Sequence, residues 1–245
     1  MNRHKFTVWT GVLLMTCAVV AQADTVVAPN ADATANGGAE QFGVFGNDSA
    51  SVITFQWDTA ASQLTSLVGE DITGIGFRLA GGDSSVTTPT TIGAFSLELS
   101  GSLNPIGSLN QTPANNIASN GVTVYDNPSL VIPANSFIGG TGPNPFYVIN
   151  FTTPFLYAGG DLLVTDTNPG TAFFAIDAVS VTGSTVTDTA GCFNGVCAPE
   201  VYNSPVTEFL ATPVTSTVPE PSSLLLCAFL SLAGAAAARK RKSVS

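Results

Sequence analysis

Basic residues and histidine are nearly absent from the central part of this 245-residue chain. Between Asp24 and Val218 the sequence has one basic residue, Arg78, against sixteen acidic residues, a net charge of −15. The only histidine is His4, close to the N-terminus. So acidic a surface repels phosphate groups, which excludes nucleic acid as a partner and leaves cations, neutral polymers and basic proteins.

The same absences exclude several kinds of active site from the central part. Without histidine or lysine there, the chain cannot build a Ser-His-Asp triad, a Ser-Lys dyad, a Schiff base or a histidine metal site. A pair of carboxylates, as in glycoside hydrolysis, remains. The glutamates considered for it are Glu70, Glu98, Glu200 and Glu208, and none lies in an evident motif. We therefore expect solvated surface carboxylates and a protein that is not an enzyme.

Cysteine is also scarce, and two of the four cysteines lie in apolar runs near the chain ends, Cys17 and Cys227. The other two, Cys192 and Cys197, flank the segment Phe193-Asn194-Gly195-Val196, in which Asn-Gly is a strong tight-turn signal. Two thiolates without a histidine are too few ligands for a structural zinc site. We therefore predict a disulfide between Cys192 and Cys197, which stabilises by about 2 kcal/mol in the chain-entropy model because the loop is short.

A metal site has no clear sequence signature here. Asp161, Asp166 and Asn168 crowd one predicted strand and its following turn, and Glu70 and Asp71 are adjacent. Calcium takes six to eight oxygen ligands, which acidic loops can supply. However, the chain has no Asp-x-Asp-x-Asp-Gly loop, and Asp and Asn are common turn residues. We expect no cofactor and assign no metal ligand, with calcium as the alternative left open.

The N-terminus has the pattern of a secretory signal peptide. A basic start, residues 1–5, precedes an apolar run over residues 6–20 and then Ala21-Gln22-Ala23. Small side chains at Ala21 and Ala23 suit signal peptidase, which predicts cleavage before Asp24. A lipoprotein would be cleaved before Cys17, but Thr16 is a poor residue before a lipidated cysteine and apolar sequence continues beyond it.

The central part alternates apolar and polar residues in short runs separated by Gly, Pro and Asn, which is typical of antiparallel strands. Residues 24–212 are therefore predicted to form an all-β domain, an antiparallel β-sandwich or jelly roll. Only residues 59–68 have helical spacing, with Gly69 as the stop, and Trp57 is expected in the core. The predicted strands cover residues 52–57, 72–79, 95–99, 122–125, 146–151, 162–165, 172–176 and 208–211. The predicted inward residues are Phe55, Phe77, Leu97, Leu99, Phe151 and Leu163.

The C-terminus has three successive parts, which follow an extended linker at residues 213–218. The first is Pro219-Glu220-Pro221, and the second is an apolar run over residues 224–238. From Ser222 to Ala238 a helix would measure about 26 Å, just enough to cross a bilayer core. The third part is the cluster Arg239, Lys240, Arg241 and Lys242, which stays on the cytoplasmic side as a membrane stop. This predicts a membrane-anchor helix with the domain outside.

This arrangement resembles the PEP-CTERM sorting signal of exopolysaccharide-producing Gram-negative bacteria. The resemblance covers about the last 28 residues and implies that residues 219–245 are a sorting signal for exosortase, a membrane-embedded transpeptidase-like enzyme. Cleavage would take place at or near Pro219, Glu220 and Pro221. Segment 151–164 is similar to one found in secreted β-sandwich proteins with the same kind of tail.

The sequence thus predicts a non-catalytic exported protein with residues 1–23 as signal peptide. Its expected partners are exosortase, the inner membrane transiently, and exopolysaccharide. We expect it at the cell surface or in the extracellular matrix after sorting. The alternative is a secreted carbohydrate-active enzyme or a calcium-dependent glycan-binding module, which would use carboxylates and an aromatic face.

Overall fold

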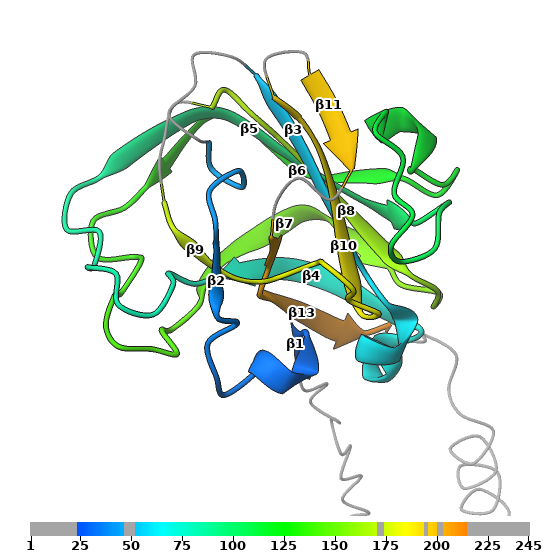
Figure 1. Cartoon of the computed structure of the whole chain (residues 1–245), viewed down its shortest axis with the longest axis horizontal. Helices are drawn as coiled ribbons and strands as arrows, with labels where there is room; N and C mark the ends of the chain where they lie inside the picture. The colour runs from blue at the N-terminus through cyan, green and yellow to red at the C-terminus, as the bar shows by residue number, and fades with distance from the viewer. Residues whose placement is uncertain (1–23, 47–51, 171–173, 194–195, 200–202, 215–245) are drawn as a thin grey trace, which may run out of the picture.

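Short alternating runs of apolar and polar residues produce strands along most of the chain in the computed structural model (Figure 1). The structure describes residues 24–46, 52–170, 174–193, 196–199 and 203–214. The strands are β1 (Asp24–Ala28), β2 (Ala39–Gln41), β3 (Ile53–Thr59), β4 (Glu70–Phe77), β5 (Thr90–Gly101), β6 (Val122–Ile132), β7 (Tyr147–Leu156), β8 (Leu162–Asn168), β9 (Ile176–Val179), β10 (Thr187–Phe193), β11 (Val196–Pro199), β12 (Ser204–Pro205) and β13 (Thr207–Pro213). The 3₁₀ turns are η1 (Asn30–Asp32), η2 (Ala61–Gln63), η3 (Thr65–Leu67) and η4 (Pro113–Asn115).

The strands form three antiparallel sheets. The largest has the order β11-β10-β3-β8-β5-β6, the second β1-β13-β4-β7, and the third β12-β9-β2. We call residues 24–214 the body. Its first and last strands are neighbours, since Asp24 on β1 pairs with Ala211 on β13. The last strand therefore lies inside its sheet, between β1 and β4, as Figure 1 shows at the bottom of the molecule. The predicted all-β class with antiparallel sheets is confirmed.

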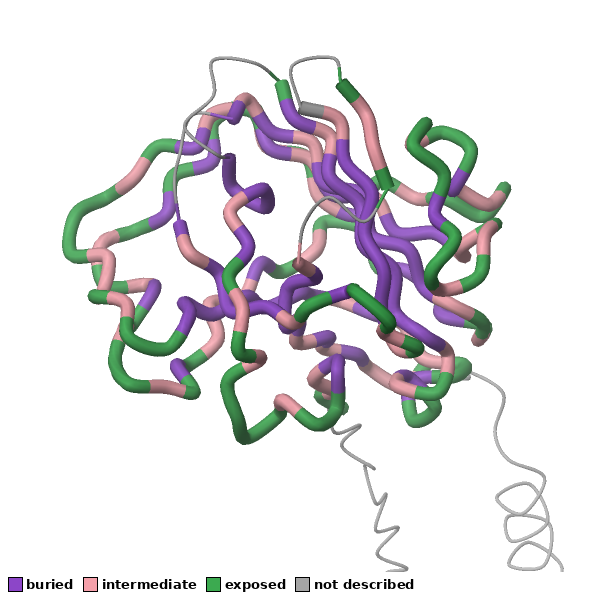
Figure 2. The backbone as a smooth tube through the Cα atoms, viewed as in Figure 1, coloured by how far each residue is buried: buried purple, intermediate pink, exposed green. Residues whose placement is uncertain are grey.

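One large hydrophobic cluster draws on both larger sheets. Phe55 and Trp57 on β3 stack with ring centroids 5.6 Å apart, and Trp57 also contacts Phe77 of β4 at 5.9 Å. Both larger sheets therefore face this cluster, and their inner strands are buried along most of their length (Figure 2). Trp57 lies in the core, as expected, and so do Phe55, Phe77, Leu97 and Leu99. Phe151 is only partly buried and packs against the cluster.

The opposite face of the six-stranded sheet is also covered in part. Leu163 on β8 was predicted with the main core, but it belongs to a second small cluster with Leu109 and Ala190. Successive strand residues point to opposite faces, so Leu163 faces away from its neighbours Leu162 and Val164, which lie in the main core. The prediction was wrong because it assumed one buried face, whereas the connection from β5 to β6 covers the other.

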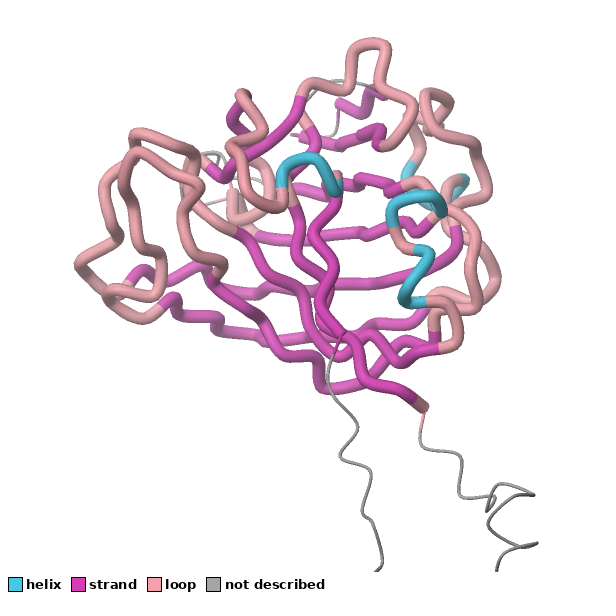
Figure 3. Tube along the Cα trace, turned by 90° about the horizontal axis from the view of Figure 1, so that it is seen from below, coloured by secondary structure: helices cyan, strands magenta, loops and turns pink. Residues whose placement is uncertain are grey.

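Residues 59–68, the segment with helical spacing, do not form a single helix. The chain forms the two short turns η2 and η3 there, which are cyan in Figure 3. Leu64 and Leu67 are fully buried, as the spacing predicted, but Val68 is exposed. The chain then turns at Gly69, which has φ +87° and leads directly into β4. Two short 3₁₀ turns therefore bring Leu64 and Leu67 into the core, and no longer helix is needed to bury them.

Other predicted elements need smaller corrections. Among the described residues of the strand expected at 172–176, only Ile176 lies in a strand, β9. The strands β1, β2, β10, β11 and β12 were not predicted. β13 extends to Pro213, which pairs with Glu70 of β4, so the sheet reaches the predicted start of the linker. No helix among the described residues is long and apolar enough to cross a membrane. The predicted signal peptide and anchor helix lie outside the described residues.

Candidate functional site

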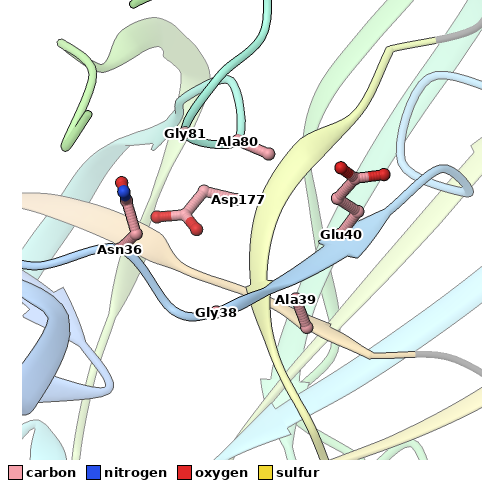
Figure 4. A pocket seen from close by; sticks show the side chains of 7 residues that line it. All are labelled: Asn36, Gly38, Ala39, Glu40, Ala80, Gly81 and Asp177. Atoms are coloured by element: carbon pink, nitrogen blue, oxygen red, sulfur yellow. The ribbon is translucent and has the colours of Figure 1, made fainter. Parts of the chain in front are cut away.

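A hollow beside the three-stranded sheet contains two carboxylates from neighbouring strands. Glu40 on β2 lies directly opposite Asp177 on β9, and both line a hollow of about 210 Å³ (Figure 4). Asn36, Gly38, Ala39, Ala80 and Gly81 complete the lining. Glycoside hydrolysis uses a pair of carboxylates, so this hollow is a candidate for that chemistry. In Figure 4, however, the Asp177 side chain points toward Asn36, whereas the Glu40 side chain extends away from Asn36.

Hydrogen bonds occupy both oxygens of the Asp177 carboxylate. The Arg78 Nε donates to Asp177 Oδ2 at 2.8 Å, and the Arg78 Nη2 lies 2.7 Å from the same oxygen. The Gly37 backbone N–H donates to Asp177 Oδ1 at 2.9 Å. Both charged side chains are 1% exposed. Because the carboxylate is held by these partners, Asp177 serves the fold, and Glu40 is the exposed acid at the rim.

Arg78 also holds the N-terminal segment in place. Its Nη2 donates to the backbone oxygen of Asp32 at 2.8 Å and to that of Ala35. Its guanidinium carbon lies 4.8 Å from the centre of the Phe146 ring, a cation–π distance. A buried charge is tolerated only when it is paired and hydrogen-bonded. Arg78 therefore joins β9 to the segment that leads into β2, beside the hollow.

A second pair of carboxylates lies beneath the connection from β5 to β6. Asp58 on β3 and Asp188 on β10 are directly opposite, and they are 0% and 1% exposed. Ser102 Oγ donates to Asp58 Oδ2 at 3.4 Å, and the Leu109 N–H donates to Asp188 Oδ2 at 3.1 Å. Burial raises the pKa of Asp58 to about 8, and the negative charges of Asp188 and Asp161 act in the same direction. The neutral form of Asp58 is therefore favoured at neutral pH, and the side chain is covered from solvent.

The glutamates singled out in the sequence do not meet. Glu98 on β5 points away from the core, as expected, because its neighbours Leu97 and Leu99 are buried in the core. Glu70 begins β4, whereas Glu208 on β13 pairs with Gly76 near the other end of that strand. Burial raises the pKa of Glu208, and the positive charge of Arg78 opposes this effect. Glu200 lies outside the described residues.

Two of the considered calcium ligands, Asp166 and Asn168, share one face of β8, and the third, Asp161, lies before the strand. Asp161 precedes the strand, and its Oδ1 accepts a hydrogen bond from the Ala61 N–H at 2.9 Å. Asp166 is wholly buried and accepts a bond from Asn168 Nδ2 at 2.8 Å, and burial raises its pKa well above the usual range. Asn168 Nδ2 also donates to the carbonyl of Gly43 at 3.0 Å. Within the described ranges, no group of three or more His, Cys, Asp or Glu side chains is arranged to hold a metal ion.

Cys192 and Cys197 form a disulfide. They face each other across the β10–β11 hairpin with Cα atoms 4.0 Å apart. The turn residues Asn194 and Gly195 lie outside the described residues. The bridge joins the edge strand β11 to β10 of the six-stranded sheet, whereas Glu40 lies in the three-stranded sheet.

Sequence reasoning missed Arg78, Asp177, Glu40 and Asp58. Arg78 carried a signal, since a single basic residue in so acidic a segment needs an acidic partner when it is buried. Asp58 carried a weaker signal. The alternation of β3 places Asp58 on the face opposite the main core, and that face of a sheet is ordinarily exposed to solvent. The partner of each residue depends on strand order, which spacing along one chain does not give.

The comparisons with known proteins concern the C-terminus. Residues 217–242 match the model of the PEP-CTERM protein-sorting motif. No curated protein and no solved structure matches the chain. The match includes Pro219, Glu220 and Pro221 and the cluster Arg239, Lys240, Arg241 and Lys242. These residues, like Ala21 and Ala23 of the predicted signal cleavage site, lie outside the described residues. The chain carries a PEP-CTERM motif, which implies an exported protein that exosortase processes and sorts to the cell surface.

Proposed function

We propose that this protein is a non-catalytic component of the cell surface or extracellular matrix, delivered there by exosortase and associated with exopolysaccharide. The sorting motif at residues 217–242 is the observation that carries the proposal. In it, the signal peptide exports the chain, residues 224–238 hold it transiently in the inner membrane, and cleavage near Glu220 detaches the body. The body is a β-sandwich whose two larger sheets enclose the shared core.

The polar chemistry of the body supports a non-catalytic role. Asp177 is bound by Arg78 and Gly37, and Asp58 is covered from solvent, with its neutral form favoured. These buried side chains therefore have hydrogen-bond partners within the fold. The body has a net charge of −15, which favours a neutral polymer over an anionic one because like charges repel.

A glycan array tests the proposed association directly. Purified body, residues 24–214, is applied with and without calcium. We expect binding to neutral polysaccharide that is unchanged by calcium. Binding to no glycan would refute the association with exopolysaccharide, and binding that requires calcium would support a calcium-dependent module.

The Glu40–Asp177 hollow favours one second candidate, a secreted carbohydrate-active enzyme. In that case Glu40→Gln would abolish sugar release from the polysaccharide, whereas Glu98→Gln on the six-stranded sheet would leave the sugar release unchanged. We expect no sugar release by either variant or by the unaltered protein. Release by the unaltered protein that is lost in Glu40→Gln would establish the enzyme.

A further inference from the structure

The two ends of the body emerge side by side at one end of the four-stranded sheet. Asp24 at the start of β1 pairs with Ala211, and β13 continues to Pro213, which pairs with Glu70. Leu156 at the end of β7 pairs with Asp71. The same end of the sheet therefore presents the first residue of the body, the last residues before the tail, and the β4 and β7 termini.

Apolar side chains are exposed at this end. Val68, Leu156 and Val214 are 54%, 55% and 49% exposed. Val68 adjoins Gly69, whose N–H donates to the Tyr157 carbonyl, so Val68 lies beside the end of β7. Asp24 and Asp71 add negative charge, and the body's single basic residue, Arg78, is buried elsewhere. This end has apolar groups suited to a lipid surface and no positive charge to bind anionic headgroups.

The length of the tail limits how far the Val214 end of the body can lie from the membrane. From Val214 to Leu224, where the apolar run begins, ten peptide steps span at most about 35 Å in any conformation. The seven steps of β4 alone span about 24 Å. To bring the opposite end of the body to the membrane, most of the tail's length would have to run back along the body. The tail length therefore favours the Val214 end as the end of an anchored body that faces the membrane.

We propose that this end, formed by Asp24, Val68, Asp71, Leu156 and Val214, lies against the outer surface of the inner membrane in the uncut, anchored protein. We name it the membrane-facing end. The inference rests on the anchoring proposed above, and it adds the orientation of the body. The tail holds the contact, because the negative charges of this end give no attraction to anionic lipid. Cleavage near Glu220 therefore frees the body from the membrane.

A quenching experiment on the full chain tests this orientation. The uncut protein, produced without exosortase and with Cys227→Ser, is placed in phosphatidylcholine vesicles that carry a nitroxide on the lipid headgroup. A fluorophore is attached at Leu156→Cys or, as a matched control, at Ile138→Cys. Ile138 is 41% exposed and lies in the connection that enters β7 at Tyr147, the residue paired with Phe77 at the far end of β4. The disulfide keeps Cys192 and Cys197 from reacting.

We expect the lipid nitroxide to quench the label at position 156 and not the label at position 138. A chain that ends at Val218 should lose the quenching. Equal quenching at both positions, stronger quenching at 138, or quenching that persists without the tail would overturn the proposal. Quenching at 156 that appears only when exosortase is added would also overturn it, since the end would then contact the enzyme. The mass of surface protein tests sorting separately, so failure of one claim leaves the other standing.

Discussion

Four of the buried titratable residues among those described form two kinds of pair. Arg78 and Asp177 carry opposite charges 2.7 Å apart, and each satisfies the other. Asp58 and Asp188 are two acids on adjacent strands, so one of them is stable only in its neutral form. The first pair makes stability depend on the presence of both partners, and the second makes stability depend on pH.

Replacing Asp58 by Asn should reduce the pH dependence of stability. The folded-state pKa of Asp58 is raised from 3.8 to about 8, so the folded protein holds this proton more tightly than the unfolded chain. The stabilisation is fully present below about pH 4 and is lost as pH rises toward 8, by up to about 1.4 kcal/mol per pH unit. Urea unfolding between pH 4 and 8 should show a slope shallower by about that amount in Asp58→Asn.

The matched control for this test is Asp126→Asn, which alters an exposed aspartate on β6. It should keep the slope of the unaltered protein. Buried Asp166 adds its own dependence in the same direction, so Asp58→Asn should retain part of the slope. Identical slopes for Asp58→Asn and the unaltered protein would show that Asp58 ionises normally.

Removing Arg78 should destabilise the body strongly. Arg78→Met leaves the Asp177 carboxylate buried without its partner and also frees the segment at Asp32. We expect a loss of about 3–5 kcal/mol in the free energy of unfolding. The double variant Arg78→Met with Asp177→Asn should recover part of this loss, because no unpaired charge remains. A single variant as stable as the unaltered protein would contradict the structural role of the pair.

At the scale of elements, the terminal strands differ in importance. β11 is an edge strand held to β10 by the disulfide, so its neighbours pair without it. β13 lies between β1 and β4 and contributes the fully buried Phe209 and Ala211. Loss of an edge element is therefore local, whereas loss of β13 leaves β1 without a partner in the sheet and β4 paired with β7 alone.

The double variant Cys192→Ser with Cys197→Ser should retain the fold. The bridge closes a loop with a sequence separation of 5, which limits its effect on the unfolded chain. We expect a loss of about 2 kcal/mol in thermal or urea unfolding, with an unchanged far-ultraviolet circular dichroism spectrum. A reductant should lower the stability of the unaltered protein to that of the variant. Loss of the strand spectrum would mean that the hairpin nucleates the fold.

Truncation should separate β13 from the tail. A chain that ends at Val206 lacks β13 and should not fold, because its sheet and core are interrupted. A chain that ends at Val214 keeps the strand and should unfold cooperatively with the strand spectrum intact. A folded chain ending at Val206 would show that β1 and β4 do not need β13. The body should then complete its folding only after residues up to 213 have been exported.

For the whole molecule, the sequence predicted the class of fold because period-two alternation is a local property. It identified most long strands and the residues Phe55, Phe77, Leu97 and Leu99 as core. It predicted the Cys192–Cys197 pair because a tight turn brings close neighbours together. The sorting motif was also recognisable, because its parts follow one another directly and need no folded partner.

The rest depends on which strands become neighbours. Arg78 and Asp177 are 99 residues apart, and Asp58 and Asp188 are brought together only by the pairing of β3 with β10. Leu163 was assigned to the wrong cluster because the sequence did not show that the β5–β6 connection covers the second face of β8. Alternation reveals that a strand has two faces, but not what lies against each one.

The most direct test of the account is the mass of the protein recovered from the cell surface. Signal cleavage before Asp24 and cleavage near Glu220 predict a form that lacks residues 1–23 and the residues from about Ser222 onward. Glu220→Ala leaves the apolar run and the basic cluster unchanged, so this variant should stay in the inner membrane uncut. Surface protein that still carries Arg239, Lys240, Arg241 and Lys242 would contradict the claim that exosortase sorts this chain.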